Sequence, residues 1–352
     1  MEKWENDHPG AGQTEARQFS GPETCEGSVA GTVSNNPTIV CISANPALDR
    51  RLRVRTLALG ETNRALSAEI LPGGKAAHVA MASRALGSRT AWIAFVGGAI
   101  GEQCANELER LEIEVVPIRT EAPTRVNLEV IDAAGAITEL LEPGSSPTQV
   151  ECENMLRTCE NRFRENWKHA LVVISGSLPA GVPPTFYTLL IQTARAAGAK
   201  VFLDTSGEAF SANLRARPDF VKPNRKEAEA VLGVRIRSSA DAQNAVAELI
   251  ARGAHSSAIT LGSEGLVWQE SARGPAWMAR PPQLDAISTV GCGDVTLAGF
   301  AYASQQGWMG EEAVRFATAC GAANCLARWE GRINFKDVES LLPRIEVSQL
   351  PQ

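Results

Sequence analysis

The sequence predicts an α/β fold: a doubly wound, mostly parallel sheet with helices on both faces, and a small antiparallel β lid. Short apolar runs rich in Val, Ile and Leu alternate with longer helical patterns from Thr38 onward. These runs are almost continuously apolar, as strands are when both faces of a parallel sheet are covered. Two further stretches are half-polar, which is typical of strands with one solvated face and predicts the separate lid.

The predicted strands of the main sheet are separated by segments long enough for crossover helices. The strands are expected at residues 38–43, 90–96, 171–175, 200–204, 219–221 and 258–261. The helical patterns lie at residues 75–86, 183–197, 225–232 and 240–252, and over most of 294–342.

The lid is predicted at about residues 50–71 and 115–142. In the second stretch Val126, Leu128 and Val130 alternate with Asn127 and Glu129, as on a strand with one polar face. Residues 1–36 combine Gly, Glu, Ser, Thr and Pro with few large apolar side chains, so we expect a disordered arm. The folded domain is then expected at 37–346, followed by a short tail at 347–352.

The composition of the 352 residues argues against several classes of protein. A net charge of -6 does not favour general affinity for nucleic acid or acidic membranes. No apolar run approaches the roughly 20 residues that span a bilayer. Eight cysteines without a C-x-x-C pair and four scattered histidines favour a reduced, cytoplasmic protein with buried thiols over a disulfide framework or a zinc site.

A glycine-rich turn leads into a helical pattern within residues 288–300. Gly291 and Gly293 flank Cys292, and Asp294 follows on the first helical turn. Glycines allow a tight turn, and the free N–H groups of a helix N-terminus bind anions. Asp294 would then accept a proton from a hydroxyl held beside that anion, as phosphoryl transfer requires. These residues alone fit a glycine turn with an Asp cap about equally well.

Further glycine and capping patterns mark turns where a ligand would approach the backbone. Gly73 and Gly74 precede a helix, and residues 260–265 read as a strand that ends in a glycine-rich turn. In open α/β sheets, ligands bind at such carboxyl ends of strands. Asn224 and Glu227 have the spacing of a capping box, and Glu227 would alternatively orient a hydrated metal near a triphosphate.

Residues 97–101 read Gly-Gly-Ala-Ile-Gly after a strand, which raises the alternative of a dinucleotide site. The spacing is not G-x-G-x-x-G, so a tight strand–helix junction is favoured.

Several longer motifs occur in order along the chain. They are Asn-Pro-Ala-Leu-Asp at 45–49, Leu-Gly-Glu-Thr-Asn-Arg at 59–64, Pro-Gly-Gly-Lys at 72–75, Thr-Arg-Val-Asn at 124–127, Ser-Gly-Ser-Leu-Pro at 175–179 and Lys-Pro-Asn-Arg-Lys-Glu at 222–227. With Gly-Cys-Gly-Asp at 291–294, they resemble the ribokinase-like (phosphofructokinase-B type) carbohydrate kinases. The similarity runs from about residue 38 to about residue 345 and is greatest to the branch of 1-phosphofructokinases and tagatose-6-phosphate kinases.

This resemblance implies an ATP-dependent kinase of a hexose phosphate, most closely fructose 1-phosphate converted to fructose 1,6-bisphosphate. It implies ATP and Mg²⁺ as cofactors, leaves a monovalent cation open, and suggests a homodimer formed through the lid. The nearest alternatives are tagatose-6-phosphate and fructose-6-phosphate kinases. More distant ones are a kinase of an unphosphorylated sugar or nucleoside, and a non-catalytic sugar-binding regulator.

The resemblance also implies roles for individual residues. In the catalytic centre, Asp294 would be the base, beside an anion hole of Gly291, Cys292 and Gly293. The sugar phosphate would be bound by Asp49, Gly73, Gly74, Lys75, His78, Arg125, Asn127 and Ser177, with Arg125 on its phosphate. The nucleotide side would comprise Lys222, Asn224, Glu227, Thr260, Gly262, Gly265 and Asn324, with Asn324 near the adenine and Glu227 acting on the metal through water.

The sequence departs from the family pattern in three places. His78 stands where the family usually has a sugar-contacting Asn, which leaves the identity of the sugar open. Ser288 replaces the usual Asp, and Cys292 replaces the usual Ala between the two glycines. The last two changes are compatible with an anion hole, because that site uses backbone N–H groups. For Arg125, a surface ion pair with Glu129 is the alternative to phosphate binding.

Overall fold

A computed structural model describes residues 39–351, and the arm predicted for residues 1–36 lies outside this range. Ten strands form one large sheet, and neighbouring strands are parallel from β11 to β5. Antiparallel strands extend it at the other edge. In spatial order the strands are β14 (Glu346–Gln349), β13 (Ala276–Arg280), β12 (Leu266–Gln269), β11 (Ser256–Thr260), β10 (Phe220–Val221), β9 (Lys200–Asp204), β8 (Leu171–Ser175), β1 (Ile39–Ser43), β4 (Thr90–Gly97) and β5 (Glu114–Thr120).

Alternate side chains of the central strand enter two separate hydrophobic cores. Ile39 and Cys41 of β1 pack into one core, while Val40 and Ile42 pack into the other, as the two-residue period of a strand requires. The first core is covered by α1 (Lys75–Ala85), α2 (Gly98–Arg110), α8 (Cys292–Gln306), α9 (Gly310–Leu326) and α10 (Phe335–Leu341). The second is covered by α3 (Gln149–Glu165), α4 (Phe186–Ala196), α5 (Gly207–Leu214), α6 (Arg225–Leu232) and α7 (Ser239–Ala251). This confirms the doubly wound α/β fold.

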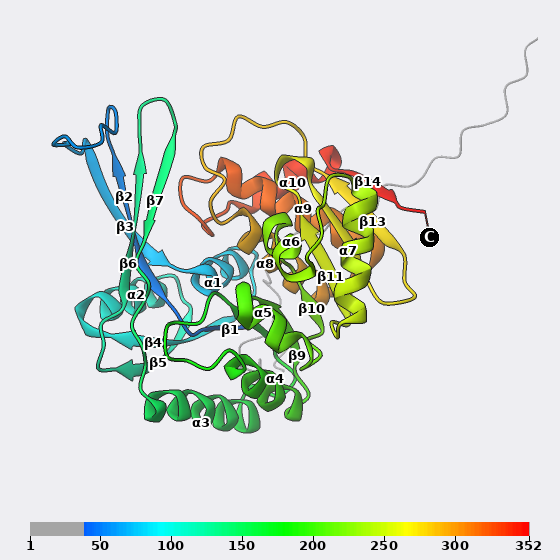
Figure 1. The fold of residues 1–352 in the computed structure, drawn as a ribbon, viewed down its shortest axis with the longest axis horizontal. Helices are drawn as coiled ribbons and strands as arrows, with labels where there is room; N and C mark the ends of the chain where they lie inside the picture. Colours follow the sequence, from blue (N-terminus) through cyan, green and yellow to red (C-terminus); the bar gives the residue numbers. More distant parts are fainter. Residues whose placement is uncertain (1–38, 352) are drawn as a thin grey trace, which may run out of the picture. The chain divides into compact units, whose positions relative to one another are not determined.

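A second, four-stranded sheet stands off the large one (Figure 1). Its order is β3 (Ser67–Gly73), β2 (Ala47–Arg53), β6 (Arg125–Ile131) and β7 (Ile137–Leu141). Both outer pairs are antiparallel, whereas the central pair β2–β6 is parallel. The separate small sheet is therefore present, with one parallel pair at its centre.

The first part of the predicted second lid segment belongs elsewhere. Residues 114–120 form β5, which pairs with β4 at the edge of the large sheet, so the lid prediction for 115–120 is wrong. Only Val116 and Ile118 of this strand are buried, in alternation with more exposed positions. An edge strand covered on one face has the same half-polar pattern as a lid strand, and the pattern could not separate the two.

The C-terminal segment is also part of the sheet. The tail predicted at 347–352 overlaps β14, which pairs with β13 in antiparallel register, with Val347 opposite Ala279. This short polar segment lacks the apolar pattern of a buried strand because it lies at the outer edge of the large sheet.

At residues 97–101 the structure has the expected strand–helix junction, since β4 ends at Gly97 and α2 begins at Gly98. Within residues 39–351, none of the helices combines the length and the apolar character that a membrane crossing needs.

The order of the strands indicates where a ligand would bind. From β1 the chain adds β4 and β5 on one side, and later adds β8, β9, β10 and β11 on the other. The direction of winding therefore reverses between β1 and β8. Ligands of such sheets bind outside the carboxyl ends of the strands at this switch point, which here are Ser43 and Ser175.

Candidate active site

Three side chains from three separate elements form one hydrogen-bonded chain. His78 lies on α1, Asp49 on β2 and Asp294 on the first turn of α8. His78 Nδ1 is 2.9 Å from Asp294 Oδ2, and His78 Nε2 is 3.1 Å from Asp49 Oδ2. Both His78 and Asp294 are buried. The predicted base and a predicted sugar-binding carboxylate thus share one imidazole.

The two carboxylates determine the charge of His78. Burial alone would lower the pKa of this imidazole, but the hydrogen bonds to Asp294 and Asp49 outweigh burial and raise the pKa to about 10. His78 is therefore an imidazolium at neutral pH and donates from both ring nitrogens. It holds Asp294 through one carboxylate oxygen, Oδ2.

This charge makes a prediction about stability. Because folding raises the pKa of His78, its protonation makes wild type more stable than His78→Asn. This difference in stability is largest below about pH 6.5, the unfolded pKa, and decreases as pH rises towards 10. We expect the difference in unfolding free energy, measured by denaturant titration, to shrink by roughly 2 kcal/mol or more across this window. The exposed His255, changed to Asn, is the matched control. A difference that stays constant or grows with pH would contradict the imidazolium assignment.

Asp49 is held close to the backbone by a glycine and an amide. Asn127 Nδ2 donates to Asp49 Oδ1 at 2.8 Å from the neighbouring strand β6. A Cβ on Gly73 would lie 2.1 Å from the Asp49 carboxyl carbon. Only glycine leaves room there for the carboxylate, which explains why Gly73 precedes Gly74 and α1 in this chain.

The N-terminus of α8 offers free backbone donors. Gly291 caps the helix at φ +74°, a left-handed conformation that glycine adopts without strain. Val295 N is the first amide to donate to a helix carbonyl, that of Gly291, so the N–H groups of Cys292 and Gly293 have no partner within the helix. The buried Lys222 adds a positive charge here, because its Nζ lies 3.2 Å from where a Cβ on Gly293 would be. These features fit the predicted anion hole, which stays a prediction.

A chain of alternating charges continues from Lys222. Its ammonium lies 3.6 Å from Asp204 Oδ2, and Lys75 Nζ lies 3.4 Å from Asp204 Oδ1. Lys75 Nζ also contacts Glu227 Oε1 at 3.1 Å. Burial alone would lower the pKa of Lys75, but the charges of Asp204 and Glu227 raise it above the usual value. Asp204 was not among the predicted site residues. Its place at the carboxyl end of a predicted buried strand could have marked it as one.

The predicted capping box at α6 is confirmed. Glu227 N donates to Asn224 Oδ1 at 2.9 Å, and Asn224 N donates to Glu227 Oε2 at 2.8 Å. Glu227 therefore caps the helix with one oxygen and contacts Lys75 with the other. Asn224 also pairs with Thr260, at the end of β11, and the turn at Gly262–Glu264 and Gly265 follows directly.

Asn324 lies near the end of α9 and joins two turns. Its side chain is buried, Nδ2 donates to Val290 O at 2.8 Å, and Oδ1 accepts from Gly331 N at 3.0 Å. The amide thus ties the turn before α8 to the turn at Gly331. The position of Asn324 near the adenine stays a prediction.

Arg125 has no carboxylate partner among the described residues. Its Nη1 donates to Glu142 O at 2.7 Å and its Nη2 to Asn45 O at 3.3 Å, while the buried Nε has no partner in residues 39–351. Asn45 in turn donates to Ser177 Oγ at 3.1 Å. The alternative pairing with Glu129 is wrong, because Arg51 of the adjacent strand binds Glu129.

A cluster of Arg51, Glu129 and Glu330 connects the small sheet with the turn before α8. None of these three residues was predicted to belong to the site. Arg51 is 2% exposed, donates to Glu129 Oε2 at 2.6 Å, and also pairs with Glu330. Glu330 accepts from Ser288 Oγ at 3.4 Å and lies against Gly291. The small sheet is therefore anchored to the turn that precedes α8. No sequence signal distinguishes Arg51 from its neighbours Arg50 and Arg53.

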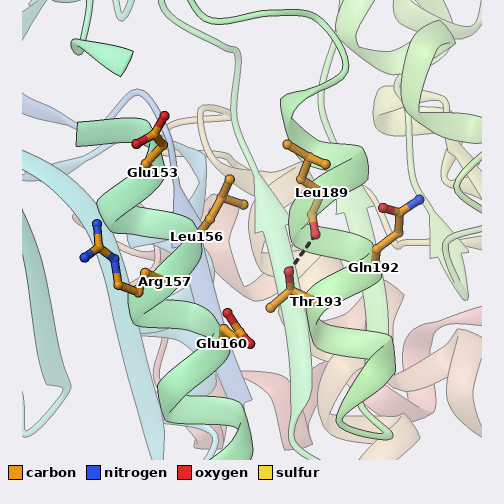
Figure 2. Close-up of a pocket in the computed structure, with 7 residues that line it drawn as sticks. All are labelled: Glu153, Leu156, Arg157, Glu160, Leu189, Gln192 and Thr193. Atoms are coloured by element: carbon orange, nitrogen blue, oxygen red, sulfur yellow. Dashed lines mark hydrogen bonds between the residues drawn. The ribbon is translucent and has the colours of Figure 1, made fainter. Parts of the chain in front are cut away.

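A cavity of about 490 Å³ lies elsewhere, between α3 and α4 (Figure 2). Leu156 and Leu189 face each other across it, and Glu153 and Arg157 stand at its side. The hydroxyl of Thr193 donates to Leu189 O within its own helix. None of the predicted site residues lines this groove, and its polar groups do not converge on a common point.

The residues at the switch point fit a site for a nucleotide better than a metal site built from protein ligands alone. Across residues 39–351, no cluster of His, Cys, Asp and Glu could hold a metal ion by itself. A Mg²⁺ ion that arrives with nucleotide phosphates needs only one or two protein carboxylates, and Glu227 and Asp204 stand beside Lys75 and Lys222. The free N–H groups of α8 and Lys222 suit the phosphates themselves.

This fold and site define a class of protein. A buried carboxylate, Asp294, stands at a helix N-terminus whose amide groups and neighbouring ammonium would stabilise a moving phosphoryl group. The class is a phosphotransferase that acts on a hydroxyl group.

Comparison with known proteins identifies the family. The model of the pfkB family carbohydrate kinases matches residues 37–329. The chain is similar to 1-phosphofructokinase from Vibrio cholerae (30% identical, covering 89% of this chain and 97% of the relative) and from Haemophilus influenzae (31%, 89% and 98%). It is also similar to the solved structure of phosphofructokinase-2 from Escherichia coli in complex with potassium (TM-score 0.81, 29% identical, 88% of this chain and 99% of that one). The chain belongs to the pfkB family, and it is an ATP-dependent carbohydrate kinase.

Proposed function

We propose that this kinase phosphorylates fructose 1-phosphate to fructose 1,6-bisphosphate. One observation carries the choice of a sugar phosphate. Arg125 and Asn127 project from the same face of β6, two residues and about 7 Å apart, and Asn127 is hydrogen-bonded to Asp49. A hexose whose hydroxyls lie on Asp49 would thus present a terminal phosphate to Arg125. The relatives from Vibrio cholerae and Haemophilus influenzae are named 1-phosphofructokinases.

In the proposed reaction Asp294 accepts the proton of the attacking hydroxyl. His78 holds Asp294 and Asp49 at fixed positions, so the base and the sugar-binding carboxylate keep their separation. Gly73 leaves room for the Asp49 carboxylate on which the sugar would rest. Gly74 would contact the sugar at the start of α1, and Ser177 would shape the pocket through Asn45. The positioning of the hydroxyl and the exclusion of free rotation account for a large part of such catalysis.

On the nucleotide side, ATP supplies the phosphoryl group and Mg²⁺ offsets the charge of its phosphates. The amides of Gly291, Cys292 and Gly293, together with Lys222, would face the transferred group. Lys75 lies between the two sides and would neutralise charge on either. Asn224, Thr260, Gly262 and Gly265 would line the nucleotide cleft, and Glu227 would act on the metal through water.

A dimer through the small sheet is part of the proposal. Ile70, Leu128 and Leu140 lie in one row across β3, β6 and β7, because they align with Arg50 in register. Ile70 and Leu140 are 42% and 59% exposed. This row also contains Arg50 and is on the opposite face from Asp49. Exposed apolar side chains gathered on one face mark protein contacts. A cytoplasmic location is proposed from the seven described cysteines, all of them free thiols.

A sugar panel tests the proposed substrate. Purified protein is given MgATP and fructose 1-phosphate, fructose 6-phosphate, tagatose 6-phosphate or free fructose, with and without KCl, and ADP release is measured. We expect the highest kcat/KM with fructose 1-phosphate, because Arg125 gains a charge-assisted contact there. A higher value with either 6-phosphate would replace the proposed substrate. A lack of turnover on every sugar would favour a sugar-binding regulator.

A further inference from the structure

Two cysteines meet at the anion hole. Cys292 is the first residue of α8, and Cys325 lies in the last turn of α9. Their sulfur atoms are 3.3 Å apart. Asn324 Nδ2 lies 3.4 Å from Cys292 Sγ, and Ile287 N donates to Cys325 O at 2.7 Å, so both partners are held in place.

This pair differs from four of the other five cysteines in residues 39–351. Cys41, Cys104, Cys159 and Cys320 are fully buried in the hydrophobic cores, and burial raises the pKa of each of these thiols. Cys292 and Cys325 are partly exposed. A dissolved oxidant would therefore reach this pair more readily than the thiols of the cores.

The contact between the two sulfurs also favours a thiolate. The hydrogen bond from Cys292 lowers the pKa of Cys325 to about 7, and the same contact raises the pKa of Cys292. The pair thus carries one readily lost proton near neutral pH. The thiolate is the form of cysteine that attacks peroxides and disulfides.

We propose that Cys292 and Cys325 are a modification site, a dithiol that peroxides or small-molecule disulfides convert reversibly into an intramolecular disulfide. With a peroxide, the Cys325 thiolate attacks one oxygen, the O–O bond breaks, and Cys325 becomes a sulfenic acid. The Cys292 sulfur then attacks the Cys325 sulfur, and the hydroxyl leaves as water. In total two thiols and one hydrogen peroxide give one disulfide and two waters, and a thiol reductant reverses the change.

The disulfide would act on catalysis through the backbone. A disulfide bond is about 2 Å long, so the two sulfurs must approach by more than 1 Å from their present separation of 3.3 Å. Cys292 carries one of the free N–H groups and lies two residues before Asp294. If the backbone of Cys292 follows its sulfur, a misplacement of about 1 Å at such a site can cost roughly 100-fold in rate. This consequence rests on the proposed anion-hole role of residues 291–293.

The test is oxidation of the full-length, reduced protein whose kinase activity has first been measured. Hydrogen peroxide and oxidised glutathione serve as separate oxidants, and intact and peptide mass spectrometry follow the thiols. We expect the loss of two hydrogen atoms, a linked pair of peptides that contain Cys292 and Cys325, and about 100-fold lower turnover that dithiothreitol restores. Cys325→Ser should keep full activity and lose the response. Cys152→Ser, which removes another partly exposed thiol, should respond as wild type does.

The mass readout separates this proposal from the proposed function. Failure of the two cysteines to link under either oxidant overturns the modification site, and so does reversible inactivation of Cys325→Ser. A linked protein with unchanged turnover rejects the effect on the anion hole. Reduced protein that forms the disulfide but turns over no sugar would instead reject the proposed function.

Discussion

Asp294→Asn is expected to lower turnover by about 10²-fold or more while nucleotide binding and the fold remain, because a positioned base contributes at least this factor. Asn has the same shape and can still accept a hydrogen bond from His78 Nδ1, which is 2.9 Å from Asp294 Oδ2 in the wild type. It cannot take up the hydroxyl proton. The loss should therefore fall on kcat, with little change in KM.

The matched control for this variant is Asp337→Asn. Asp337 is the acidic residue in the first turn of another helix, α10. Steady-state kinetics, nucleotide affinity by calorimetry and thermal melting are measured on both variants. Near-normal turnover of Asp294→Asn would show that another group is the base. A collapse of nucleotide binding would show that Asp294 acts by supporting the anion hole.

The second large effect concerns the substrate's own phosphate. Arg125→Ala should lower kcat/KM for fructose 1-phosphate by about 10- to 100-fold, the worth of a charge-assisted contact with a phosphate. Within residues 39–351 the guanidinium donates only to two backbone carbonyls and its buried Nε is unpartnered, so it has donors available. Free fructose has no phosphate to lose, and its weaker reaction should change little.

The comparison between the two sugars guards against a purely structural effect. Loss of the contacts to Glu142 O and Asn45 O would disturb both substrates equally. Arg119→Ala is the control, because this arginine pairs with Glu102 on the surface. Equal losses on both sugars, or no loss on either, would reject phosphate recognition by Arg125. The enzyme would then be better described as a kinase of neutral sugars.

The parts of the fold that the sequence predicted well are those determined by local pattern. The strands at 171–175 and 200–204 and the helix at 225–232 begin and end where they were expected. Continuous apolar runs identify strands buried on both faces. The capping box of Asn224 and Glu227 lies within one helical turn, so a few neighbouring residues contain the whole signal.

The elements that the sequence did not predict lie near the sheet edges or outside the regular alternation of apolar strands and helices. Helix α3 was not predicted, although Met155, Cys159 and Phe163 recur at helical spacing and Thr148 opens a capping box. Strands β12 and β13 are short and were also missed. Strand β5 was assigned to the lid because an edge strand and a lid strand share one alternating pattern.

The sequence by itself determined the doubly wound fold, the small separate sheet and the kinase family. The periodicity of apolar residues, helix caps and glycine turns can be recognised there because they are properties of neighbouring residues. Only the tertiary structure decided which of these residues meet. His78 is 216 residues from Asp294, and Lys75 is 129 from Asp204. Arg51, and not Arg125, binds Glu129, and Cys292 lies against Cys325. These pairings depend on strand order and register, which place distant segments side by side and leave no local trace in the sequence.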